Sequence, residues 1–111
     1  MKRSKITLVI YSDPGHSWCR VHQTLLEELN IQDKITRYSY KRNGSAYLEE
    51  DVDFETLVRA LDATYPNIKI TYKEHHTNKQ SKIRSYVPYT QLNIFKDFLN
   101  NHVEFIMVGE K

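Results

Sequence analysis

Two pairs of side chains in this sequence are of the types that bind zinc. Cys19 and His22 lie three residues apart, and His75 and His76 are adjacent. A structural zinc site takes four such ligands, so the two pairs together could complete one. However, the segment that ends at His75 has the pattern of a strand, and adjacent residues of a strand point to opposite faces. His75 and His76 therefore cannot bind one ion without a bend, and we expect neither a metal nor another cofactor.

The polar loop SDPGHS, residues 12–17, follows the first apolar run of the chain and could bind a ligand. Asp13 and His16 have the chemistry of an acid and a base, and they could also bind a divalent ion. The simpler interpretation is that Asp-Pro-Gly forms a turn. We predict that Asp13, His16 and Trp18 form a second contact surface, and we expect no catalytic residue.

The run YLEEDVD places four carboxylates within five residues, Glu49, Glu50, Asp51 and Asp53. Such a run could bind a hard cation, but it lacks the glycine and the ligand spacing of an EF-hand loop. Acidic residues also simply stabilise the N-terminus of a helix that follows them. A third interpretation is an acidic patch that mimics nucleic-acid phosphates and occupies a basic groove on another protein.

The segment YKEHHTNKQSKIRSY, residues 72–86, interleaves basic and aromatic side chains. Residues 68–86 carry five basic residues and one acidic residue, a local net charge of +4. Such cations bind phosphates, and the tyrosines can stack on bases. The segment is therefore suited to bind a nucleic acid. The alternative is a solvated connection, although long connections inside a domain are often functional. The contact residues that we predict here are Lys73, His75, His76, Asn78, Lys82, Arg84 and Tyr86.

The clearest local signal is Asn43-Gly44, which lies between two alternating runs. Both residues adopt positive φ readily, as a type I′ hairpin turn requires. Because a two-residue loop fixes the register, cross-strand pairs that are aromatic or oppositely charged are expected to support it. The predicted pairs are Tyr40 with Tyr47, Arg42 with Ser45, and Arg37 with Glu50.

Hydrophobic periodicity predicts the remaining elements. A continuous β-branched run indicates a strand that is covered on both faces, and apolar residues at i, i+3, i+4 and i+7 indicate an amphipathic helix. Asp53 and Thr90 stand at the starts of two helices and suit N-caps. The predicted elements are a strand at 5–11, helices at 19–30 and 51–67, a strand at 68–75, a helix at 89–101 and a strand at 103–108.

With the hairpin, the order of elements is β-α-β-β-α-β, followed by α-β. The first six elements match the ferredoxin-like motif. We therefore predict a single α+β domain over 1–111, ferredoxin-like with an added C-terminal helix and strand. RNA-recognition domains use the same kind of sheet. Their aromatic and basic signature is absent, because the corresponding strand has the acidic sequence SAYLEED, so we exclude an RNA-recognition domain proper.

The composition fits one domain. The chain has 111 residues, of which 40% are hydrophobic and 12% aromatic, and this suffices for one core. Cys19 is the only cysteine, so an intramolecular disulfide cannot form, as in a reducing cytoplasm. The apolar run near the N-terminus is too short for a signal peptide or a membrane span. We expect no membrane association, and the net charge of +2 favours no particular partner.

Four motifs resemble, in order, a family of small uncharacterised proteins of tailed bacteriophages and related mobile elements. These motifs are YSDPGHSW, LLEELNIQDKI, SYKRNGSAYLEEDVD and EHHTNKQSKIRSY, and the resemblance covers residues 9–89. It implies no catalytic residue, but it implies a context, because such proteins act in the bacterial cytoplasm and often bind a host component. Cys19 stands where the family pattern has an apolar residue, which counts against zinc and thiol chemistry.

We therefore predict a small phage-type accessory protein in the cytoplasm of a bacterial host. It would bind nucleic acid, or a defence or replication protein of the host, and act without catalysis. Two alternatives stay open. One is a mimic whose acidic patch inhibits a host nucleic-acid-binding protein, and the other is a small metal-dependent enzyme that uses residues 13–16 with His75 and His76.

Overall fold

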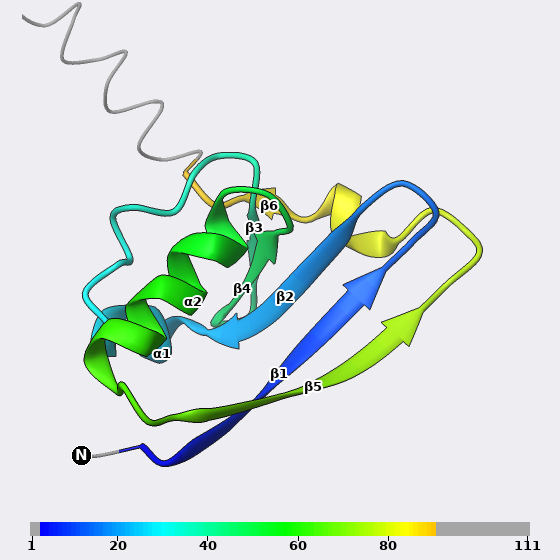
Figure 1. Cartoon of the computed structure of the whole chain (residues 1–111). Coiled ribbons are helices and arrows are strands. Elements are labelled where there is room, and N and C mark those ends of the chain that lie inside the picture. Colours follow the sequence, from blue (N-terminus) through cyan, green and yellow to red (C-terminus); the bar gives the residue numbers. More distant parts are fainter. Residues whose placement is uncertain (1–2, 91–111) are drawn as a thin grey trace, which may run out of the picture.

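A six-stranded mixed sheet with two helices forms the described part of the chain. The computed structural model describes residues 3–90 (Figure 1). Across the sheet the strand order is β5-β1-β2-β4-β3-β6, with β1 and β5 parallel and all other neighbours antiparallel. In chain order the elements are β1 (Lys5–Ser12), β2 (Ser17–His22), α1 (Gln23–Glu28), β3 (Tyr40–Arg42), β4 (Ser45–Glu49), α2 (Asp53–Thr64), β5 (Lys69–His76), the 3-10 turn η1 (Lys82–Ser85) and β6 (Val87–Pro88).

The helix predicted over 19–30 is wrong in its first part. Residues Ser17–His22 form strand β2, which pairs with β1 on one side and with β4 on the other. Helix α1 begins only at Gln23 and has six residues. Leucines at helical spacing signalled the helix, but the strand in front of it is decided by pairing with distant strands, which local periodicity does not report.

The predicted order of elements is consequently changed. An additional strand precedes the first helix, so the described chain reads β-β-α-β-β-α-β before η1 and β6. From β2 to β5 the order is β-α-β-β-α-β, and β1 is inserted between β5 and β2. The class α+β is confirmed, but the sheet is larger than that of a ferredoxin-like domain.

The Asn43-Gly44 hairpin is confirmed. Asn43 and Gly44 have φ angles of 51° and 78°, and Tyr40 lies opposite Tyr47 in the predicted register. The pair of Arg42 with Ser45 also forms. The predicted pairing of residue 37 with residue 50 is absent from the ladder, because β3 begins only at Tyr40.

One face of the sheet packs against α1 and α2 to make the core. Leu57 and Leu61 of α2 are fully buried, as their helical spacing predicts, and Phe54 packs at the edge of the core. The sheet contributes Leu8 and Leu48 from β1 and β4. Strand residues alternate between the two faces, so their neighbours in the sequence project from the opposite face. We call this opposite face the open face.

The connection from β5 to β6 must cross the sheet, because these strands form its two edges. Residues 77–86 make this crossing over the open face, and we call them the crossing segment. Figure 1 shows it in yellow, passing the tip of the β1–β2 hairpin before it reaches β6. The polar connection that the sequence shows is therefore a strap across the sheet, and Ile83 within it is buried.

The predicted helix over 89–101 lies outside the described residues, apart from Tyr89 and Thr90, which form a turn. The predicted strand over 103–108 lies outside them entirely. In the described part of the chain, no helix has the length and apolar character needed to cross a membrane.

Asp53 is a buried carboxylate and does not cap α2 as predicted. The N-cap position is Val52, and the carboxylate of Glu49 accepts hydrogen bonds from the first amides of the helix, including that of Asp53 at 2.6 Å. Asp53 accepts bonds from the Thr36 amide at 3.0 and 3.1 Å and from the hydroxyls of Thr36 and Ser39. It therefore ties the loop before β3 to α2.

We expect Asp53→Asn to lower the free energy of unfolding by about 1.5–3 kcal/mol. The NH₂ group of the asparagine would face the hydrogen-bond donors of Thr36 and Ser39, and the charge-assisted bonds of the carboxylate would be lost. Chemical denaturation measures the difference. The matched control is Asp62→Asn, an exposed position on the same helix, which should stay within about 0.5 kcal/mol of the parent chain. Equal losses in both variants would contradict this role for Asp53.

Candidate nucleic-acid interface

A groove of about 550 Å³ lies between the open face of the sheet and the crossing segment. The sheet side contributes Tyr11 from β1, Arg20 from β2 and Tyr47 from β4. Among the described residues that line it, three carry a positive charge, three are tyrosines and none is acidic. The crossing segment contributes Thr77, Lys79, Gln80, Ser81, Lys82, Ile83 and Tyr86.

The aromatic rings of the groove form a continuous row across the strands. His75 of β5 stacks on Tyr11, with ring centroids 5.1 Å apart and planes 18° apart. Tyr11 lies 6.4 Å from Tyr47, whose ring meets the edge of Tyr86 at 5.0 Å. Such offset and edge contacts are favourable between aromatic rings. The row brings together side chains from the three strands β5, β1 and β4 and from the crossing segment.

Burial raises the pKa of Tyr47 above its ordinary value. A tyrosine hydroxyl is already neutral at neutral pH, and the raised pKa extends this range further into alkaline pH, so the hydroxyl can donate a hydrogen bond.

Arginines lie over these rings. The guanidinium carbon of Arg20 is 5.7 Å from the ring centroid of Tyr11, and that of Arg42 is 4.9 Å from the ring centroid of Tyr86. Both distances are within the range of a cation–π contact. Lys73 projects from the same face, because it lies opposite Val9 in the β1–β5 ladder. Cations and aromatic rings therefore alternate over the open face.

Asp13 anchors the crossing segment to the tip of the β1–β2 hairpin. Its carboxylate accepts a pair of bonds from Arg84, Nε at 2.7 Å and Nη2 at 2.9 Å, and a further bond from the Ser81 amide at 2.9 Å. The amides of Gly15 and His16 donate to the same carboxylate at 2.9 Å, which closes the hairpin loop. One buried side chain thus joins residues that are 71 positions apart.

These contacts assign Asp13 and Arg84 a structural role. The bonds that Arg84 donates hold the pKa of Asp13 well below its ordinary value, so the carboxylate stays ionised. The guanidinium of Arg84 also lies 5.6 Å from the ring centroid of Trp18. Asp13 is buried in this ion pair, whereas Arg84 keeps 29% of its side chain exposed and lines a hollow beside Trp18.

The structure gives the three residues of the predicted second surface unequal exposure, although His16 and Trp18 line one hollow of about 450 Å³. The side chain of Trp18 is buried, with 3% of the residue exposed, beneath Arg84 and beside Tyr40. His16 is exposed, and its Nδ1 atom lies 3.3 Å from a carboxylate oxygen of Glu50. Of the three predicted residues, only His16 is exposed, and Trp18 reaches the surface only where it lines a hollow.

The two adjacent histidines point to opposite faces of the sheet, as the strand pattern predicts. His75 belongs to the aromatic row, whereas His76 lies on the other face, where its Nδ1 atom is 3.0 Å from the Ser12 hydroxyl. The Nε2 atom of His76 is 3.2 Å from the side-chain oxygen of Asn78. His76 and Asn78 therefore bond to each other outside the groove.

Cys19 and His22 do not share a helix face, because both lie on β2. Residues three apart on a strand point to opposite faces. Burial also raises the pKa of the Cys19 thiol to about 12, which disfavours the thiolate that binds zinc. Among residues 3–90, no group of three His, Cys, Asp or Glu side chains is placed to hold a metal ion.

Two of the four carboxylates in the acidic run YLEEDVD have structural roles. Glu49 accepts bonds from backbone amides at the start of α2, and Asp53 is fully buried. Glu50 and Asp51 stay at the surface. Only two of the four carboxylates are therefore available to imitate phosphates.

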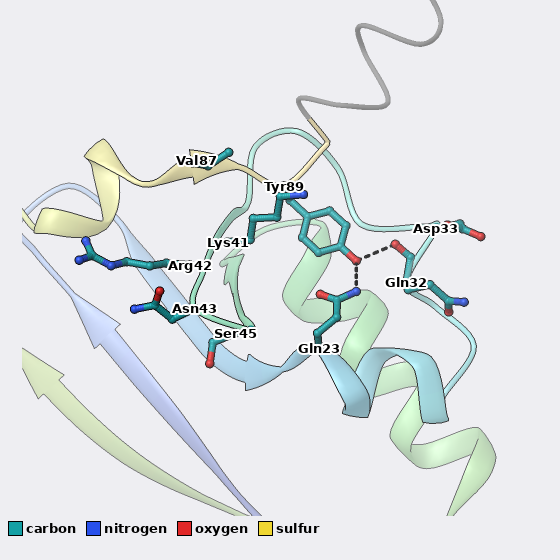
Figure 2. Close-up of a pocket in the computed structure, with 10 residues that line it drawn as sticks. Gln23, Gln32, Asp33, Lys41, Arg42, Asn43, Ser45, Val87 and Tyr89 are labelled. Atoms are coloured by element: carbon teal, nitrogen blue, oxygen red, sulfur yellow. Dashed lines mark hydrogen bonds between the residues drawn. The ribbon is translucent and has the colours of Figure 1, made fainter.

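A second hollow of about 500 Å³ lies near the end of the described chain (Figure 2). The Tyr89 hydroxyl accepts a bond from Gln23 Nε2 at 2.9 Å and donates one to the Gln32 carbonyl at 2.8 Å. Tyr89 is buried, and its hydroxyl joins α1 to the loop before β3. Two polar groups of this hollow, those of Gln23 and Gln32, thus hold Tyr89, and the lining contains the acidic Asp33, so the groove on the open face is the stronger candidate for an anionic ligand.

Sequence reasoning found part of the groove and missed its floor. The predicted residues Lys82 and Tyr86 line the groove, and the predicted His75 completes the aromatic row. Tyr11, Arg20 and Tyr47 were missed, because each lies on a different strand. The signal was present in β2, where polar residues alternate with Cys19 and Val21.

Comparison of the chain with protein-family models, with curated proteins and with solved structures finds no match.

The anchor at Asp13 predicts a stability that depends on pH. Because the pKa of Asp13 is lowered in the folded state, its contribution is complete above the unfolded value of about 4 and is lost as the pH falls below that value. Thermal unfolding between pH 2 and pH 7 measures this loss. Asp13→Asn should lower the melting temperature by several degrees at pH 7 and much less at pH 2. A difference between the two chains that is independent of pH would contradict the anchor.

Proposed function

We propose that the chain is a small phage-type accessory protein that binds single-stranded nucleic acid of its bacterial host without catalysis. The observation that carries the proposal is the groove on the open face, with its row of tyrosines, its cations and no acidic lining residue among those described. Lysine and arginine release counterions when they bind phosphates, and aromatic rings stack on bases of any sequence.

An unpaired strand fits the groove better than a duplex does. The rings of Tyr11 and Tyr47 lie on the floor, and the crossing segment forms a wall beside them. The faces of paired bases are hidden by stacking, so only unpaired bases can reach these rings. Lys79 and Lys82 on the crossing segment are exposed and would meet the phosphates.

The arrangement of the sheet supports this use of the open face. The proposal treats β2 to β5 as a ferredoxin-like unit into which β1 is inserted. Domains of this architecture can present aromatic residues on the open face of the sheet and stack them on RNA bases. This is an analogy of scaffold, and the specific support comes from the side chains. The resemblance to phage proteins supplies the setting, the cytoplasm of a bacterial host.

Charge removal in the groove should weaken binding and change its salt dependence. We expect Lys82→Ala to lower the affinity for a fluorescent oligothymidine and to reduce the slope of log K against log salt by about 0.7, the value for one phosphate contact on a single strand. Fluorescence anisotropy across a salt series measures both quantities.

Lys34→Ala is the matched control, since it removes the same charge from an exposed loop that does not line the groove. It should leave the slope unchanged. No binding by the parent chain to oligothymidine or to oligouridine would contradict the proposed function.

Ring removal should weaken binding without changing the salt slope. We expect Tyr86→Ala to cost about 1–3 kcal/mol of binding free energy, because one base loses its stacking partner. Tyr86→Phe keeps the ring and should retain most of the affinity. Anisotropy at a fixed salt concentration compares the three chains. Equal losses from alanine and phenylalanine would show that the hydroxyl, and not the ring, makes the contact.

A further inference from the structure

Within the described residues 3–90, strand β5 presents a free edge along its whole length. Among residues 3–90, β1 is the only strand that pairs with it. The amide of Lys69 donates to the Ser4 carbonyl and that of Thr77 donates to the Ser12 carbonyl, so odd-numbered residues direct their backbone groups toward β1. In a strand, the next residues direct theirs the other way. The outer edge therefore offers the N–H and C=O groups of Ile70, Tyr72, Glu74 and His76.

The edge at β5 lacks most of the features by which edge strands avoid pairing with a strand of another molecule. The opposite edge strand, β6, has two residues, and one of them is Pro88. By contrast, β5 has eight residues in unbroken register with β1 and contains neither proline nor glycine. Long, regular edges of this kind are templates for another strand. Tyr72 near the middle of β5 is 53% exposed.

We propose that β5 pairs with β5 of a second copy of this chain. The two strands run antiparallel about a twofold axis at Tyr72, so the two sheets join into one. In this register Tyr72 lies opposite its own counterpart, and Ile70 lies opposite Glu74 of the other copy. These are residues whose backbone groups point outward, so each pair can exchange two hydrogen bonds.

Repulsion between lysines disfavours the neighbouring register of the two β5 strands. With Tyr72 on the axis, Lys73 lies opposite Thr71 and Lys69 lies opposite His75. A shift by one residue would place Lys73 opposite its own counterpart, and like charges directly opposite each other destabilise a sheet. An aromatic pair at the axis is favourable instead.

Self-complementarity favours a second copy as the partner. One strand supplies both halves of a register in which Lys69 and Lys73 face His75 and Thr71 and no like charges lie directly opposite each other.

Sedimentation velocity of the full chain tests the pairing, and it needs no nucleic acid. We expect the parent chain to form a species of twice 13.2 kDa at tens of micromolar. Tyr72→Lys and Tyr72→Glu should each be monomeric, because each places like charges on the twofold axis. An equimolar mixture of the two variants should restore the dimer, because lysine then faces glutamate.

Tyr38→Lys is the control, since Tyr38 is 63% exposed and lies away from β5. It should associate like the parent chain. A parent chain that stays monomeric would overturn the proposal, and so would two Tyr72 variants that both remain dimeric. Association by Tyr72→Lys alone would overturn the register, because in the shifted register residue 72 faces Glu74 of the other copy. Circular dichroism verifies that each variant is folded.

Discussion

The carboxylate of Asp13 holds together the two parts of the molecule on which the candidate site depends. It closes the β1–β2 hairpin through the amides of Gly15 and His16, and it fixes the crossing segment through Ser81 and Arg84. A buried carboxylate that lost its arginine would be strongly destabilising. Without this anchor the crossing segment would be held over the sheet only by the burial of Ile83, by the contacts of Tyr86 and by the pairing of β6 with β3.

Sheet topology creates the need for that anchor. Because β5 and β6 are opposite edges, the chain between them must pass over one face, and the other face is occupied by α1 and α2. The two faces of the sheet therefore have different roles. One face supplies the core, and the other carries the tyrosines and cations of the groove. Alternate residues of the same strands therefore supply the core on one face and the candidate binding surface on the other.

Elements that depend on neighbouring residues could be predicted from the sequence, whereas the pairing of strands far apart in the chain could not. The positive-φ pair Asn43-Gly44 specified a hairpin and its register, and leucine spacing specified α2, because both depend on neighbouring residues. Strand β2 was read as a helix, since its state depends on pairing with β1 and β4. In the site, basic and aromatic spacing identified Lys82 and Tyr86. The partners on the floor and the bond from Arg84 to Asp13 come from positions far apart in the chain, so no local pattern reveals them.

Photo-crosslinking with an oligonucleotide that carries 5-iodouracil tests the central claim most directly. Peptide mapping by mass spectrometry locates each crosslink on the chain without any substitution in the protein. The account predicts crosslinks to the tyrosines of the groove, Tyr11, Tyr47 or Tyr86, because they lie where bases would stack. Crosslinks confined to the helical face, around α1 and α2, or no crosslinks at concentrations that saturate binding, would contradict it.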